Sequence, residues 1–220
     1  MAHGFEGHTI RGMFLFDLPV GLVALWLFHY FMKQPALIFV PRAIRRRVKS
    51  DAYSFLPPAR LALIAISILI GSATHILWDA FTHGFYWPAR HWRFLRTNVE
   101  LPIVGHMVMF KFLQYVSSVA GLLFVGLWVW YWYRTTRPVD HAIAQPYSAA
   151  QRAALTVVLP LVALGAGILR AHPSMKTFEA IRPVVNFAAD TVVTGIAIFA
   201  LELLVCGVML RLSHRTSEVS

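Results

Sequence analysis

Residues 71–83, which read GSATHILWDAFTH, carry two histidines and an aspartate at four-residue intervals inside a long apolar run. Four residues of an α-helix turn through about 400°, so His75, Asp79 and His83 are predicted to project along one helical face. Imidazole nitrogen and carboxylate oxygen are typical zinc ligands. The pattern therefore predicts a divalent-metal site, with His75 and Asp79 as its first-choice ligands.

His83 can join this site only under a further condition. His75 and His83 are separated by about 12 Å along the axis of an ideal helix. One metal can bind all three residues if the helix ends near Thr82, an ending that Gly84 and the loop after it favour. The other solution is a second metal, bridged to the first by Asp79. Both solutions remain open at this point.

The chain around this segment has the composition of a membrane protein. Of its 220 residues, 58% are hydrophobic and 14% are charged, which is too apolar for an ordinary soluble domain. A helix needs about 20 mostly apolar residues to cross a bilayer. The sequence therefore predicts an all-α fold, a polytopic transmembrane helical bundle that forms a single integral membrane domain over residues 1–220. The predicted spans are residues 14–32, 61–81, 104–133, 153–170 and 187–212.

The formal net charge of +10 raises the question of nucleic-acid binding. The basic residues lie mostly in loops beside the apolar runs, where they would meet anionic lipid headgroups. The predicted partner is therefore the lipid bilayer, and nucleic acid is not expected.

Other spans also carry polar residues, which are costly against lipid and usually face other helices or a water-filled cavity. We expect these polar faces to line one cavity with the His–Asp face. Glu202, deep in the last span, is a functional candidate on the same ground, with no evident partner. The polar residues are His106, Lys111, Gln114, Ser117 and Ser118 in the third span, and Asn186, Asp190 and Thr194 in the fifth.

Four strings of the sequence are specific enough to compare with known families. They are GHTIRGMFLFDLPVGL (7–22), PRAIRRRV (41–48), GSATHILWDAFTH (71–83) and FLQYVSSVAGLL (112–123). Together they resemble the bacterial membrane-protein family known as domain of unknown function 4184. That family looks related to membrane-bound proteins described as metal-dependent hydrolases, with helix-borne His and Asp ligands similar to those of zinc-dependent phospholipase C. The resemblance carries over His8, His75, Asp79 and His83 as metal ligands.

The resemblance also has a consequence for the start of the chain. Family members usually begin with a His-Pro pair and a Gly-Ser…Pro-Asp stretch, and the strings quoted above follow both of these features. The reading frame is therefore expected to extend upstream; the alternative is a version of the protein that has lost activity.

The residues and the resemblance together indicate a multi-pass protein of the bacterial inner (plasma) membrane. We expect a divalent metal, zinc, to be bound by His8, His75, Asp79 and His83. The metal would activate water to hydrolyse a lipid-linked or other amphipathic substrate. The alternative is a non-enzymatic membrane protein in which the same groups form a proton or ion relay or hold the bundle together. Metal content distinguishes the two.

We predict that the N-terminus lies outside and the C-terminus in the cytoplasm. Cytoplasmic loops retain an excess of Lys and Arg, and the loops that this threading places inside carry twelve of them, against eight on the other side. The same threading puts His75, Asp79 and His83 on the outer side. A C-terminal reporter should be active only in the cytoplasm. Activity only outside would contradict the topology and invert the placement of the site.

Overall fold

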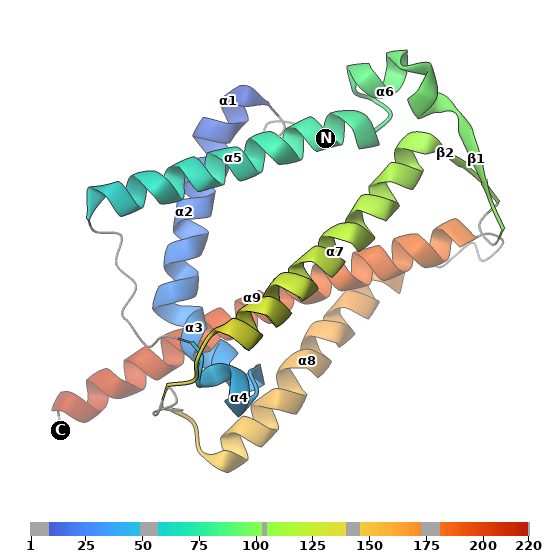
Figure 1. Ribbon diagram of the computed structural model, residues 1–220. Helices are drawn as coiled ribbons and strands as arrows, with labels where there is room; N and C mark the ends of the chain where they lie inside the picture. The colour runs from blue at the N-terminus through green and yellow to red at the C-terminus, as the bar shows by residue number, and fades with distance from the viewer. Residues whose placement is uncertain (1–8, 49–56, 103–104, 140–145, 173–180, 220) are drawn as a thin grey trace. The chain divides into compact units, whose positions relative to one another are not determined.

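The computed structural model describes residues 9–48, 57–102, 105–139, 146–172 and 181–219 (Figure 1). Five of its helical stretches are long and apolar enough to cross a membrane, which confirms the predicted all-α class with about five spans. They are Ile10–Phe39, Pro58–His91, Met109–Thr135, Ala149–Ala171 and Phe187–Ser213.

The first span consists of several short helical elements in series. Two five-residue π-helical turns, η2 and η3, interrupt its α-helix, and such turns occur frequently at functional sites. The elements are α1 (Ile10–Gly12), η2 (Met13–Asp17), α2 (Leu18–Leu27), η3 (Phe28–Met32), α3 (Lys33–Ala36) and the 3₁₀ turn η4 (Leu37–Phe39).

The remaining elements alternate long helices with short connecting pieces. They are α4 (Arg42–Arg45), α5 (Pro58–Thr82), α6 (Trp87–His91), η5 (Arg93–Arg96), β1 (Asn98–Leu101), β2 (Gly105–Val108), α7 (Met109–Thr135), α8 (Ala149–Ala171) and α9 (Ile181–Val219). The first backbone N–H groups of a helix have no helical partner. Proline suits the start of α5 because it has no N–H, and Ser148 caps α8 because its side chain accepts a hydrogen bond from one of these groups.

The chain divides into two compact units. The first comprises Met1–Ala24 and Ser54–Thr136, and the second comprises Leu25–Tyr53 and Arg137–Ser220. This division by contacts does not test the predicted single integral membrane domain over residues 1–220, which stays a prediction. In the first unit η2 packs against α5, and α5 contacts α7.

The third span begins later than the sequence predicted. Its helix starts at Met109 rather than near residue 104, because Gly105–Val108 pairs as an antiparallel strand with Asn98–Leu101. Gly105 adopts a φ of +75°, a conformation that glycine accepts readily. His106 therefore lies opposite Glu100 in a hairpin, and not on the polar face of α7. A short apolar run does not distinguish a strand from the start of a helix.

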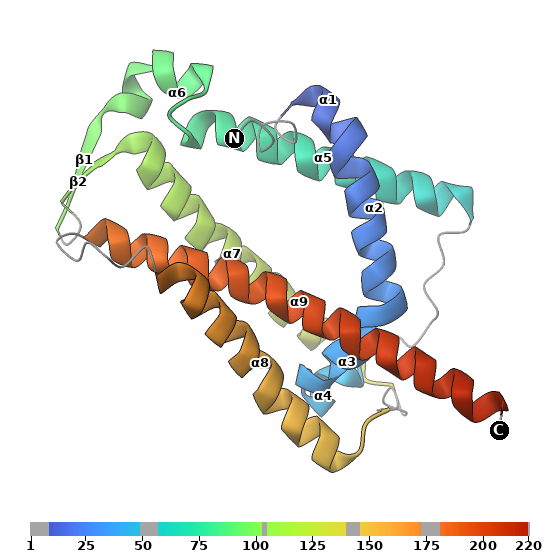
Figure 2. The same cartoon turned by 180° about the vertical axis from the view of Figure 1, so that it is seen from behind.

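In the second unit α8 packs along α9, as both views show (Figures 1 and 2). Small residues permit this close approach, since a Cβ added at Gly167 would overlap the backbone carbonyl of Thr191. The segment η3 also packs against α9. There a Cβ added at Gly207 would overlap the carbonyl oxygen of Phe31.

Arg211 of α9 completes the contact with η3. Its Nε donates a hydrogen bond of 2.8 Å to the carbonyl oxygen of Tyr30, and its guanidinium carbon lies 3.4 Å from the centre of the Tyr30 ring. Arginine suits this position because it combines planar donors with a cation–π contact.

We predict that Gly207→Ala destabilises the protein in detergent by about 1–3 kcal/mol, because overpacking a close helix contact forces a backbone shift. The measurement is the thermal unfolding midpoint. Gly126→Ala on α7 is the matched control, since an added Cβ there meets nothing within 4 Å. That control should be neutral or stabilising, by up to about 1 kcal/mol from helix propensity. Equal effects of the two variants would contradict the packing assignment.

Candidate functional site

The helix that carries His75 and Asp79 ends at Thr82, the position at which His83 can join them. His83 leaves the helix in an extended conformation, with φ −118° and ψ 122°. Its backbone N–H still donates to the carbonyl oxygen of Asp79 at 2.9 Å, which closes the last turn. The helix end that a joint site requires is therefore present.

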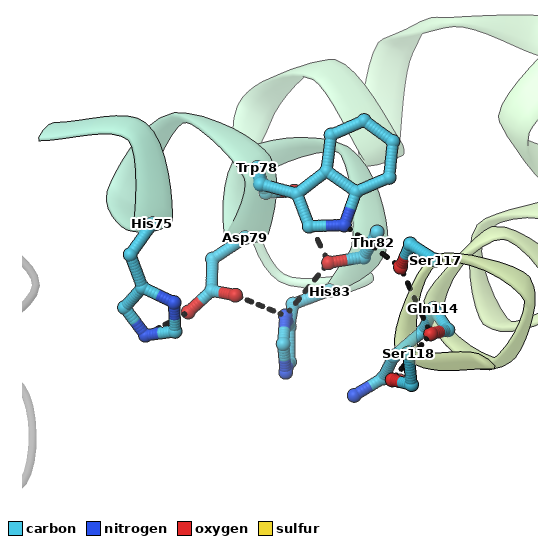
Figure 3. A network of polar contacts seen from close by, with 8 residues as sticks. All are labelled: His75, Trp78, Asp79, Thr82, His83, Gln114, Ser117 and Ser118. Atoms are coloured by element: carbon cyan, nitrogen blue, oxygen red, sulfur yellow. Dashed lines mark hydrogen bonds and ion pairs between the residues drawn. The ribbon is translucent and has the colours of Figure 1, made fainter. Parts of the chain in front are cut away.

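Asp79 lies between the two histidines (Figure 3). His75 Nε2 is 3.5 Å from Asp79 Oδ2, and His83 Nδ1 is 3.5 Å from Asp79 Oδ1. The side chain of Asp79 is only 11% exposed, whereas those of His75 and His83 are 65% and 34% exposed. The buried carboxylate thus presents one oxygen to each of two more accessible imidazoles.

Thr82 fixes the His83 end of this arrangement. It is buried, its hydroxyl donates to the carbonyl oxygen of Trp78 at 3.1 Å, and its Oγ1 lies 3.3 Å from His83 Nδ1. A proton on His83 Nδ1 would therefore face two acceptors, Thr82 Oγ1 and Asp79 Oδ1. That tautomer leaves Nε2 of His83 available to a ligand.

Polar residues of α7 join the network through Trp78. The indole Nε1 of Trp78 donates to Ser117 Oγ at 3.0 Å (Figure 3). The hydroxyls of Ser117 and Ser118 both donate to the carbonyl oxygen of Gln114, at 3.0 and 2.8 Å. This part of the predicted third-span polar face does lie beside the His–Asp helix.

Other predicted site residues are placed elsewhere. His106 is in the hairpin, where its Nδ1 lies 3.5 Å from Glu100 Oε1. His8, which the family resemblance carried over, lies outside the described residues, as does the side chain of Asn186. Asp190 and Thr194 belong to α9 in the second unit, so the cavity shared by three spans stays a prediction.

Glu202, also on α9, is half-buried. Its Oε2 is buried and has no hydrogen-bond partner among the residues that the structure describes.

Sequence reasoning missed one residue, Asp17. Asp17 ends the π-helical turn η2, and its Oδ2 accepts a hydrogen bond from Ser72 Oγ. Ser72 lies on α5 three residues before His75, so a second carboxylate reaches the helix that carries the His–Asp set. The signal was an acidic residue within the apolar string FLFDLPVG, since an ionisable group inside a span is a functional candidate by default.

The arrangement of these groups decides what they can bind. Across the described ranges, no three His, Cys, Asp or Glu side chains form a group around one metal position. The geometry consists instead of two His–Asp pairs that share one carboxylate.

The comparisons with known proteins agree with the resemblance drawn from the sequence. A family model described as domain of unknown function (DUF4184) matches residues 2–209. No curated protein and no solved structure matches the chain. Because the match covers nearly the whole chain, including all four strings that carried the resemblance, the protein belongs to the DUF4184 family.

Proposed function

We propose that the protein is a metal-dependent hydrolase of the bacterial inner membrane, with zinc or another divalent cation at His75, Asp79 and His83. The single observation that supports this proposal best is the buried Asp79 carboxylate with one imidazole 3.5 Å from each of its oxygens. The predicted threading places this site on the outer side of the membrane, within reach of amphipathic or lipid-linked substrates.

The two His–Asp separations are longer than direct charge-assisted hydrogen bonds. Charge-assisted N–H···O hydrogen bonds are about 2.7–2.9 Å long, and both separations here are 3.5 Å. A divalent cation at this site would be held by His75 Nε2, the Asp79 carboxylate and His83 Nε2, because Nδ1 of His83 faces Asp79 and Thr82.

The spacing of these residues leaves one cation or two as alternatives. His75 faces Oδ2 of Asp79 and His83 faces Oδ1, so Asp79 would contribute to either arrangement. Each cation would need further ligands, and His8 is the candidate that the family resemblance supplies.

A bound zinc ion would supply water with a pKa of about 7, as a nucleophile for hydrolysis. The chain's own residues do the positioning. Asp79 holds the two imidazoles on one face, and Thr82 fixes the ring of His83. Asp17 orients the hydroxyl of Ser72, which lies on the helix of His75, three residues before it.

The competing proposal is a non-enzymatic relay. Asp79 connects His75, which is largely exposed, with His83 at the end of the helix, and protons can pass along such a chain of imidazole and carboxylate groups. A relay of this kind requires no metal, so metal content separates the two proposals.

We predict that the purified protein contains stoichiometric divalent metal and that His75→Ala and Asp79→Asn each lower its metal affinity by at least tenfold, since each removes a ligand. Metal content is measured by mass spectrometry of the element after dialysis against a weak chelator. His106→Ala is the control, because His106 pairs with Glu100 in the hairpin. His8→Ala tests the ligand that the family resemblance supplies.

Wild-type metal in both His75→Ala and Asp79→Asn would contradict the site. Metal-free wild-type protein with an intact fold would favour the relay.

A further inference from the structure

The segment after the His–Asp helix folds into a small structure of its own, which we call the arginine–aromatic cap (residues 85–96). It contains α6 and η5 and is held in place by two buried residues, Ala89 and Leu95, which are 2% and 3% exposed. The rings of Phe81 in α5 and Trp92 in the cap lie 5.4 Å apart. The cap is therefore packed onto the end of α5 that carries His83.

The outer surface of the cap is aromatic. Four large aromatic side chains of the cap are each 45–63% exposed: Phe85, Trp87, Trp92 and Phe94. Aromatic residues, Trp above all, gather at the level where a chain leaves the hydrocarbon, because one part of the ring is apolar and another is polar.

The cap is also strongly basic. Arg90, Arg93 and Arg96 are all exposed, and the backbone carbonyl of Arg90 accepts a hydrogen bond of 3.4 Å from Arg96 Nη1, which keeps the two residues together. The sequence has no Asp or Glu from residue 80 to residue 98. Three exposed arginines thus alternate along the chain with exposed aromatic residues, and the segment has no acidic residue to balance their charge.

Charge and location identify the partner of this surface. The cap is continuous with a span whose apolar residues Ile70 and Leu77 are exposed, as expected for a helix in lipid. Guanidinium groups bind phosphate in a bidentate manner, and each basic residue near an anionic membrane surface contributes about 1 kcal/mol to binding. An anionic phospholipid satisfies both parts of the surface at once, with its phosphate on the arginines and its acyl chains against the rings.

We propose that the arginine–aromatic cap binds the headgroups of anionic phospholipids and presents them to the His–Asp site. The rings of His83 and Phe85 lie 5.7 Å apart, so the cap begins directly beside the site. Anionic phospholipids would therefore be the substrate class of the site. That last step rests on the proposed hydrolase function, whereas the binding itself does not.

The test is photocrosslinking of the full chain in vesicles that contain phosphatidylglycerol and phosphatidylcholine, one of which carries a diazirine near the headgroup. Peptide mass spectrometry then locates the adducts. On residues 84–97 we expect the yield of phosphatidylglycerol adducts to exceed that of phosphatidylcholine adducts at least about fivefold. That factor corresponds to about 1 kcal/mol. The triple variant Arg90→Gln, Arg93→Gln, Arg96→Gln should bring that ratio close to one.

The control variant is Arg42→Gln, Arg46→Gln, Arg137→Gln, which removes the same charge from exposed arginines of the second unit. It should keep the wild-type ratio on residues 84–97. A wild-type ratio near one, or an unchanged ratio in the cap variant, would overturn the proposal. The readout needs no metal, so preferential adducts in a metal-free protein would uphold the lipid surface while the hydrolase proposal fails.

Discussion

An ionisable carboxylate inside a membrane span must find partners, because an unpaired aspartate costs up to about 3 kcal/mol on insertion scales. Asp79 meets this constraint locally, with His75 one turn before it and His83 one turn after it, each next to a different carboxylate oxygen. The helix end at Thr82 and the threonine hydroxyl beside His83 serve the same arrangement. The candidate site is thus built mainly from one helix and its last turn.

Each unit also relies on a π-helical turn of the first span. In the first unit η2 ends at Asp17, which accepts the hydrogen bond from Ser72 of α5. In the second unit η3 presents the carbonyl oxygen and the ring of Tyr30 to Arg211 of α9. A π-turn displaces the groups of one helical turn from their regular positions. A π-helical turn therefore presents the Asp17 side chain to α5 in the first unit and the Tyr30 carbonyl oxygen to α9 in the second.

The sequence predicted the parts of this account that depend on periodicity and length. Five apolar runs predicted the spans, and four-residue spacing predicted that His75, Asp79 and His83 share a face. The hairpin was missed because Gly105–Val108 continues the apolar pattern of α7, and only pairing with Asn98–Leu101 distinguishes it. Asp17 was missed because its partner Ser72 is far away in the sequence, and spacing along one helix says nothing about a second helix.

Zinc K-edge X-ray absorption of the purified protein measures whether Asp79 and its two histidines bind a divalent cation. Binding by these residues predicts a shell of nitrogen and oxygen ligands at about 2.0–2.2 Å with outer-shell scattering from imidazole, lost in Asp79→Asn. A sulfur shell at about 2.3 Å, which would indicate the lone Cys206, or imidazole scattering that persists in Asp79→Asn would contradict it.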